Sequence, residues 1–127
     1  MTTLLLDTHA WVWSLTASAN LTKRASDSIL GADTILVSPI SFYEVGQKVR
    51  IGKWPEMATI VDRLLALSEE QGVAIAGLDS ATCLAASTLP WTNRDSFDRM
   101  LAATALRRDV PIVSADTVFD GVVARVW

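Results

Sequence analysis

Short apolar runs separated by helical patterns constrain the fold of this chain more than any other feature. Extended segments are expected at Thr2–Leu6, Thr34–Val37, Val73–Leu78 and Val110–Ser114, and a final extended segment at Val122–Val126. Strands that alternate with helices form a parallel sheet covered by helices on both faces. We therefore expect an α/β fold with three layers (α/β/α) and a central parallel sheet of four or five strands.

The expected helices follow from apolar periodicity and from start and stop signals. Pro39 suits the first turn of a helix that runs to about Ile51. A long amphipathic helix is expected over Glu56–Gln71, with Gly72 ending it. The other helical segments are His9–Leu15, Leu21–Leu30, a short helix that begins at Asp79 or Ser80 and ends at Ser87, and Ser96–Arg108.

Composition excludes several classes of protein. The 127 residues, half of them hydrophobic and a fifth charged, fit one domain over residues 1–127 rather than a disordered chain. The single cysteine, Cys83, excludes a disulfide framework and a cysteine-rich zinc site, and we expect it to be a small buried residue. We expect a cytoplasmic protein without a signal peptide or a membrane span. A net charge of −3 argues against broad electrostatic capture of nucleic acid.

Four acidic residues lie just beyond expected strands or near the start of expected helices: Asp7, Glu44, Asp98 and Asp116. In open parallel sheets, ligands bind outside the carboxyl ends of the strands. Carboxylates gathered at one place resist ionisation unless a cation neutralises them. The leading hypothesis is therefore a divalent metal site built from these four acids.

Each acid also has a simpler interpretation. Asp7 is equally well explained as a helix N-cap, and Asp116 as a turn residue. Asp95 is better explained as the cap of the helix that contains Asp98. For Glu44 alone, a solvated helical ion pair with Lys48 is the more common meaning of the spacing. The joint placement of the acids, and no single one, favours the metal site.

Residues beside the acids have two interpretations each. Thr8 and Ser114 carry hydroxyls that could hold a metal-bound water, or they serve as cap and turn residues. Arg94 and Arg99 could contact phosphate or balance the acids. We expect His9 to be structural, packing or hydrogen bonding beside Asp7. For most of the five tryptophans we expect core or interface packing, and the best candidates for stacking on RNA bases are Trp54 and Trp91.

Four blocks of residues together resemble the PIN-domain toxins of bacterial toxin–antitoxin pairs, the VapC type. The blocks are Leu5–Trp13, Val37–Val45, Leu89–Ala103 and Ile112–Asp116, in that order along the whole chain. The resemblance implies a metal-dependent endoribonuclease with Asp7, Glu44, Asp98 and Asp116 as its acidic quartet. It also implies a homodimer and inhibition by a small cognate antitoxin. Asn93 and Ser96 stand where the family pattern has histidine and proline, and neither change removes an acid of the quartet.

An acid-only site favours Mg²⁺, with Mn²⁺ as the alternative, and leaves one ion or two open. His9 is the only histidine, so a mechanism that uses two histidines lacks one member. We therefore expect water to attack phosphorus in line, leaving a 5′-phosphate and a 3′-hydroxyl. The alternative functions are a PIN-like module that binds RNA or protein without cutting, and a metal-dependent phosphatase or DNA nuclease.

Overall fold

The central strand β1 (Thr3–Leu6) organises the sheet in the computed structural model, which describes residues 1–127. It pairs with β2 (Thr34–Val37) on one side and with β4 (Ile112–Val113) on the other. Strands β3 (Ala74–Ile75) and β5 (Arg125–Val126) form the edges, giving the order β3-β2-β1-β4-β5 with every pair parallel. The expected α/β class and its parallel sheet are confirmed, with five strands.

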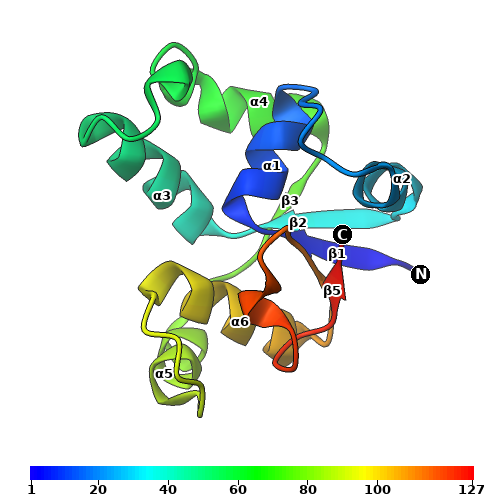
Figure 1. The fold of residues 1–127 in the computed structure, drawn as a ribbon, viewed down its shortest axis with the longest axis vertical. Helices are drawn as coiled ribbons and strands as arrows, with labels where there is room; N and C mark the ends of the chain where they lie inside the picture. The colour runs from blue at the N-terminus through cyan, green and yellow to red at the C-terminus, as the bar shows by residue number, and fades with distance from the viewer.

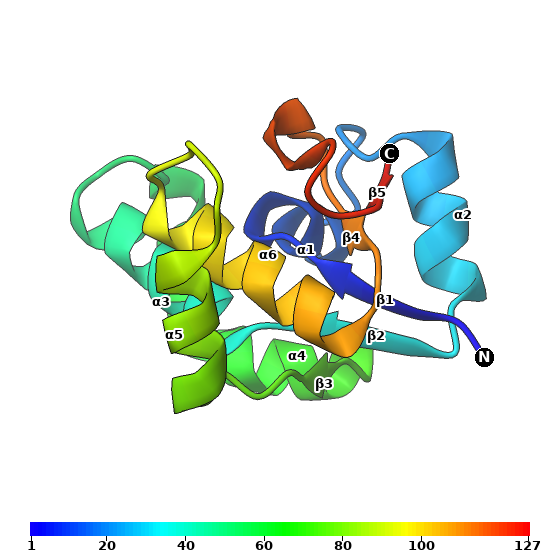
Figure 2. The same cartoon turned by 90° about the horizontal axis from the view of Figure 1, so that it is seen from below.

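Alternation along β1 divides the core into two layers. Successive side chains of a strand point to opposite faces of the sheet. Leu4 and Leu6 accordingly join one buried cluster, which also contains Trp11, while Leu5 joins a second cluster on the other face. The first cluster lies under α1 to α4 and the second under α6, so helices cover both faces (Figures 1 and 2).

The helices begin at polar caps that the sequence carries at the expected places. The bounds are α1 Thr8–Leu15, α2 Lys23–Gly31, α3 Pro39–Arg50, α5 Ser80–Thr88 and α6 Ser96–Arg108. In each case the side chain of the residue before the helix accepts a hydrogen bond from a backbone N–H in its first turn. These cap residues are, in the same order, Asp7, Thr22, Ser38, Asp79 and Asp95. None of these helices has the length and hydropathy needed to cross a membrane.

The prediction of one long helix over Glu56–Gln71 is wrong. The segment contains two single 3-10 turns, η1 (Pro55–Met57) and η2 (Val61–Arg63), before helix α4 (Leu64–Gln71). The β-branched run Thr59–Val61 disfavours a continuous helix, and backbone N–H groups here bond three residues back instead of four. The expected apolar face is broken too, because Leu65 is exposed. Gly72, with a φ of +79°, does end α4 as expected.

Three strands are shorter than their expected segments, among them β5, which covers only Arg125–Val126 of the expected Val122–Val126. The run Val73–Leu78 gives only the two residues of β3, and Val110–Ser114 gives only the two of β4. β3 is an edge strand that pairs only with Leu36 and Val37 of β2. β4 is opposite Leu5 and Leu6 alone, so the register restricts the ladder to the carboxyl half of β1. Strand length here depends on the partner, which the local sequence does not specify.

Two adjacent leucines of α4 test the interrupted arrangement. Leu64 is 4% exposed and belongs to the first core cluster, whereas Leu65 is 70% exposed. We expect Leu64→Ala to lower the free energy of unfolding by about 2–5 kcal/mol. Leu65→Ala, the matched control, should change it by no more than about 0.5 kcal/mol. Urea denaturation of the two variants measures the difference, and equal losses would instead support a continuous helix that buries both leucines.

Candidate functional site

The carboxyl ends of three neighbouring strands meet where the strand order reverses. The chain leaves β1 toward β2 and later returns to the other side of β1 as β4, which makes this a topological switch point of the sheet. Asp7 follows β1 directly, and Asp116 lies just after β4. Glu44 comes from α3, which follows β2, and Asp98 comes from the first turn of α6. Helices α1 and α3 begin at this edge (Figure 1).

Asp7 is the most enclosed of the four acids, with 8% of its surface exposed. Its backbone N–H donates to Val113 O at 3.1 Å, which extends the pairing of β1 with β4 by one residue. Its Oδ1 accepts from the N–H of Ala10 at 2.7 Å, and Ser114 donates a side-chain hydrogen bond to it. The expected N-cap role is confirmed, and capping holds the carboxylate at the end of the strand.

Glu44 is also buried and has a defined partner for each oxygen. Thr8 Oγ1 donates to Oε1 at 2.7 Å and lies 2.9 Å from Ser41 Oγ. Lys48 Nζ lies 2.8 Å from Oε2, so the expected pair between residues 44 and 48 exists. It is not a solvated pair, because Glu44 is only 8% exposed. Helix α1 thus contacts the acid of α3 through Thr8.

Asp98 is oriented by Asn93, which departs from the family pattern. Asn93 Nδ2 donates to Asp98 Oδ2 at 2.9 Å, and its Oδ1 accepts from the N–H of Asp95 at 3.0 Å. Asp95 Oδ1 accepts from the N–H of Asp98 at 2.9 Å, which confirms its expected role as the cap of α6. Ser96, the second departure, is the first residue of α6 and is exposed.

Asp116 is exposed at the surface and is tied to the buried acids through Ser114. Its backbone N–H donates to Ser114 Oγ at 3.0 Å, and the same hydroxyl donates to Asp7. Asp116 Oδ1 accepts from the N–H of Val118 at 2.9 Å and caps the 3-10 turn η3 (Thr117–Phe119). Ser114 is fully buried, so it connects the acid after β1 with the acid after β4.

Electrostatics couple the acids to one another. The pKa of Asp7 is raised to about 6, chiefly by burial and also by the charges of Glu44 and Asp98, against hydrogen bonds from Ser114 and Ala10 that lower it. Burial also raises the pKa of Asp98, with contributions from the charges of Asp95, Asp116 and Glu44, against a hydrogen bond from Asn93. The charges of neighbouring acids therefore act on both Asp7 and Asp98.

Arg99 differs from the sequence expectation that it contacts phosphate. Its guanidinium donates to the backbone carbonyls of residues 86, 87, 89, 91 and 93, at N···O distances from 2.5 to 3.5 Å. An arginine side chain has five N–H donors, so these carbonyls use its full capacity. Arg99 is a structural clamp on the loop between α5 and α6. Arg94 is exposed in that loop, and its contact with phosphate stays a prediction.

The aromatic residues near the site also differ from expectation. Trp54 is 8% exposed and cannot stack on a base, because its ring is covered by His9 at a centroid distance of 4.8 Å and lies beneath Lys48. Trp91 is half-buried and tilts against Phe119 at 5.9 Å. His9 packs as expected, against Trp54 and, at an angle, Trp13.

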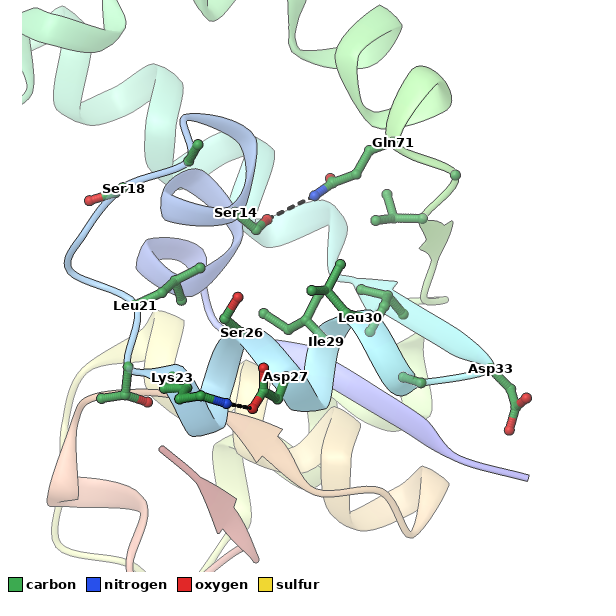
Figure 3. A pocket seen from close by; sticks show the side chains of 16 residues that line it. Ser14, Ser18, Leu21, Lys23, Ser26, Asp27, Ile29, Leu30, Asp33 and Gln71 are labelled. Atoms are coloured by element: carbon green, nitrogen blue, oxygen red, sulfur yellow. Dashed lines mark hydrogen bonds and ion pairs between the residues drawn. The ribbon is translucent and has the colours of Figure 1, made fainter.

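A cavity of about 830 Å³ lies elsewhere in the molecule. Its walls come from α1, the 17–22 loop, α2, β2 and the end of α4, as Figure 3 shows. Gln71 projects into this region and its amide donates to Ser14 Oγ at 2.8 Å. None of the four acids lines the cavity, so this hollow and the acidic edge are separate features of the molecule.

Comparison with known proteins identifies the family. Residues 4–124 match the family model of the PIN domain. The chain belongs to the PIN domain family. It is 29% identical over 117 residues to ribonuclease VapC22 of Mycobacterium tuberculosis, which covers 91% of this chain and 88% of that protein. The resemblance to VapC-type PIN domains is therefore confirmed.

Solved structures share this PIN fold at low sequence identity. A toxin–antitoxin complex from Klebsiella pneumoniae superposes with a TM-score of 0.67 at 16% identity, covering 98% of this chain and 96% of that one. VapBC2 from Rickettsia felis, bound to a DNA fragment from their promoter, gives 0.66 at 15% identity over 98% and 97%. These neighbours establish the fold at nearly full length.

PIN-family nucleases are typically metal-dependent, and the donor set of this PIN domain fits a hard divalent cation. The four side chains offer only carboxylate oxygens, the ligands that Mg²⁺ prefers. Their side chains as they stand do not form a cage, since no three such groups are placed to hold an ion together. Mg²⁺ is usually held by one or two carboxylates with water and substrate phosphate, so a preformed cage is not required.

The sequence does not predict the contacts of two polar residues at the site. Asn93 donates to Asp98, and Ser41 contacts Thr8, the residue that donates to Glu44. Ser41 lies three residues before Glu44 on α3, a spacing that puts both on one helix face. Asn93 lies five residues before Asp98, outside any regular element, so periodicity gives no signal for its contact with that acid.

The raised pKa of Asp7 predicts a pH-dependent effect of Asp7→Asn in metal-free buffer. Its folded pKa of about 6 exceeds the ordinary 3.8, so the native state binds the proton more tightly than the unfolded state. The contribution of Asp7 to stability is therefore fully present below pH 3.8 and is lost as pH rises through about 6. Asparagine is also a good N-cap and removes the charge.

We therefore expect Asp7→Asn to match the wild type near pH 4 and to be more stable by about 2–3 kcal/mol at pH 8. Thermal unfolding in EDTA across this range measures the difference. Asp62→Asn, at an exposed residue of η2, is the control and should show no such trend. A stability difference that stays constant from pH 4 to 8 contradicts the raised pKa.

Proposed function

We propose that this PIN domain is a metal-dependent endoribonuclease, the toxin of a toxin–antitoxin pair. The observation that carries the proposal is the acidic edge: Asp7, Glu44, Asp98 and Asp116 at the switch point of the sheet, electrostatically coupled. Binding alone does not require four acids gathered at one edge of the sheet. The non-catalytic binding module is the alternative that the experiments below are designed to exclude.

The relatives support the class of substrate. The curated relative with 29% identity is a ribonuclease, and the neighbour from Klebsiella pneumoniae is a toxin–antitoxin complex. We infer that this chain hydrolyses RNA phosphodiester bonds and that a small cognate antitoxin binds it. We also propose that it forms a homodimer.

Mg²⁺ is the proposed cofactor, with Mn²⁺ as a substitute, held by Asp7, Glu44, Asp98 and Asp116. A bound divalent ion supplies Lewis acidity, which lowers the pKa of the attacking water and offsets charge on the scissile phosphate. Asn93 and Ser114 fix the orientation of Asp98 and Asp7 by donating hydrogen bonds to them. Thr8 does the same for Glu44. Three of the four acids are thus oriented by hydrogen bonds from uncharged side chains.

Lys48 has a distinct role in this proposal. Its ammonium pairs with Glu44 and is itself only partly exposed. A divalent ion that binds Glu44 competes with this ammonium for the same carboxylate. The lysine therefore offsets the charge of Glu44 and weakens the attraction of the acidic edge for a metal cation.

Cleavage of RNA by the purified chain, freed of antitoxin, tests the function directly. A labelled panel of structured RNAs should be cut with Mg²⁺ or Mn²⁺ and left intact with EDTA. Asp7→Asn and Asp98→Asn should each lose at least about a hundredfold in rate, because each removes a charged ligand. The matched control Asp62→Asn, an exposed acid in η2, should cut like the wild type.

The products also discriminate between mechanisms. In-line attack by water leaves a 5′-phosphate and a 3′-hydroxyl, whereas a 2′,3′-cyclic phosphate would refute the proposed chemistry. Cutting of DNA in preference to RNA would support the alternative nuclease. If folded protein cuts no RNA and Asp7→Asn binds Mg²⁺ as well as the wild type does, the binding module is the better description.

Removal of Lys48 should strengthen metal binding. We expect Lys48→Gln to lower the dissociation constant for Mn²⁺ by about three- to tenfold, because a positive charge leaves the neighbourhood of Glu44. Lys53→Gln, which removes the same charge from the exposed loop after α3, is the control. Calorimetric titration measures both, and an unchanged or weaker affinity in Lys48→Gln would mean that Lys48 does not compete with the ion.

A further inference from the structure

The imidazole of His9 packs against two aromatic rings, although the residue is exposed. It stacks on Trp54 with a centroid distance of 4.8 Å and an interplanar angle of 29°. Trp13, one helical turn further along α1, packs against it at 5.6 Å and 55°. His9 itself is exposed, while Trp54 beneath it is buried. A flat ring fixed by two aromatic neighbours and open to solvent has the form of a stacking surface.

A short series of contacts connects this ring to the acidic edge. Lys48 Nζ lies 5.5 Å from the centroid of the Trp54 ring on which His9 stacks, and 2.8 Å from Glu44 Oε2. His9 also lies in the first turn of α1, directly after Thr8, whose hydroxyl donates to the same glutamate. The exposed ring is therefore linked through Trp54 and Lys48 to Glu44, one of the acids proposed to hold the metal ion.

We propose that His9, supported by Trp54, forms a binding site for one unpaired nucleobase of the RNA next to the phosphate that is cleaved. This inference rests on the proposed function, and it names the part of the substrate that the site recognises. Single-stranded RNA is bound by stacking its exposed bases on aromatic side chains. A duplex cannot present a base in this way without unpairing it, so the site selects loops and single strands.

The other aromatic residues near the acids fit this role less well. Trp54 is covered by His9 and supports the His9 ring from beneath. Tyr43 is 58% exposed, and its ring lies 6.1 Å from that of Phe97 at a tilted angle. No contact links Tyr43 to a carboxylate of the quartet in the way that Trp54 and Lys48 link His9 to Glu44. Tyr43 is therefore the natural comparison residue.

The experiment measures RNA binding separately from cleavage. The parent protein carries Asp98→Asn so that the RNA stays intact, and its affinity for a short labelled single-stranded RNA is measured by fluorescence anisotropy in Mg²⁺. We expect His9→Ala to weaken binding by about tenfold and His9→Phe to restore it to within about twofold. His9→Gln, which keeps polarity without a ring, should bind like His9→Ala. Tyr43→Ala should bind like the parent.

An RNA of the same length with abasic sites separates base from backbone contacts. The parent and His9→Ala should bind it equally, because the stacking partner is missing from the ligand. Equal affinity of parent and His9→Ala for the base-containing RNA overturns the inference, as does an effect of His9→Ala that persists on the abasic RNA. A loss of RNA affinity in Tyr43→Ala but not in His9→Ala overturns the inference as well, and would place the bound nucleobase at α3 instead.

The two proposals fail in different ways. If protein with Asp98 intact cuts RNA while His9→Ala binds like the parent, only the stacking site is refuted. If it cuts nothing while binding still depends on the ring at residue 9 and on the base, the nuclease is refuted and the stacking site stands. Circular dichroism of each variant confirms the fold, and an alanine at this exposed helical residue costs α1 nothing in propensity.

Discussion

A carboxylate buried at the end of the central strand is the constraint on which the rest of this molecule depends. Asp7 directly follows β1, caps α1 and lies near other acids. One side chain therefore connects the strand, the helix and the acidic edge. Burial of a charge without a partner is costly, and a raised pKa is the result. The sheet order also brings other acids close to Asp7, because the strands on both sides of β1 lead to acids at the same edge.

Neutral hydrogen-bonding groups make the acidic edge compatible with a folded protein. Ser114, Thr8 and Asn93 each donate to a different acid, and each comes from a different segment of the chain. The acids are thereby oriented without being neutralised, apart from Glu44, which has Lys48. Such preorganised carboxylates favour a divalent cation, since an ion regains the electrostatic energy that folding has spent.

Local signals in the sequence predicted most of the fold, because caps and apolar periods act over a few residues. Asp79 and Asp95 cap the helices as expected, and β2 has its expected bounds. The segment Glu56–Gln71 was predicted wrongly because its periodicity ignores the β-branched run and the demands of the core. Strand ends and helix starts pointed to the four acids, whereas the contact of Asn93 with Asp98 and most contacts of Arg99 involve the loop between α5 and α6, where no periodicity predicts them.

The clamp formed by Arg99 has a consequence for how this protein can change during evolution. Surface loops commonly gain and lose residues because their backbone is solvated. The last turn of α5 and the loop that follows it instead have five carbonyls directed at one guanidinium, two in the helix and three in the loop. An inserted or deleted residue would turn some of these carbonyls away, and Lys in place of Arg has too few donors to replace them. A change in the length of this loop would therefore disturb both the contacts of Arg99 and the position of Asn93, which orients Asp98.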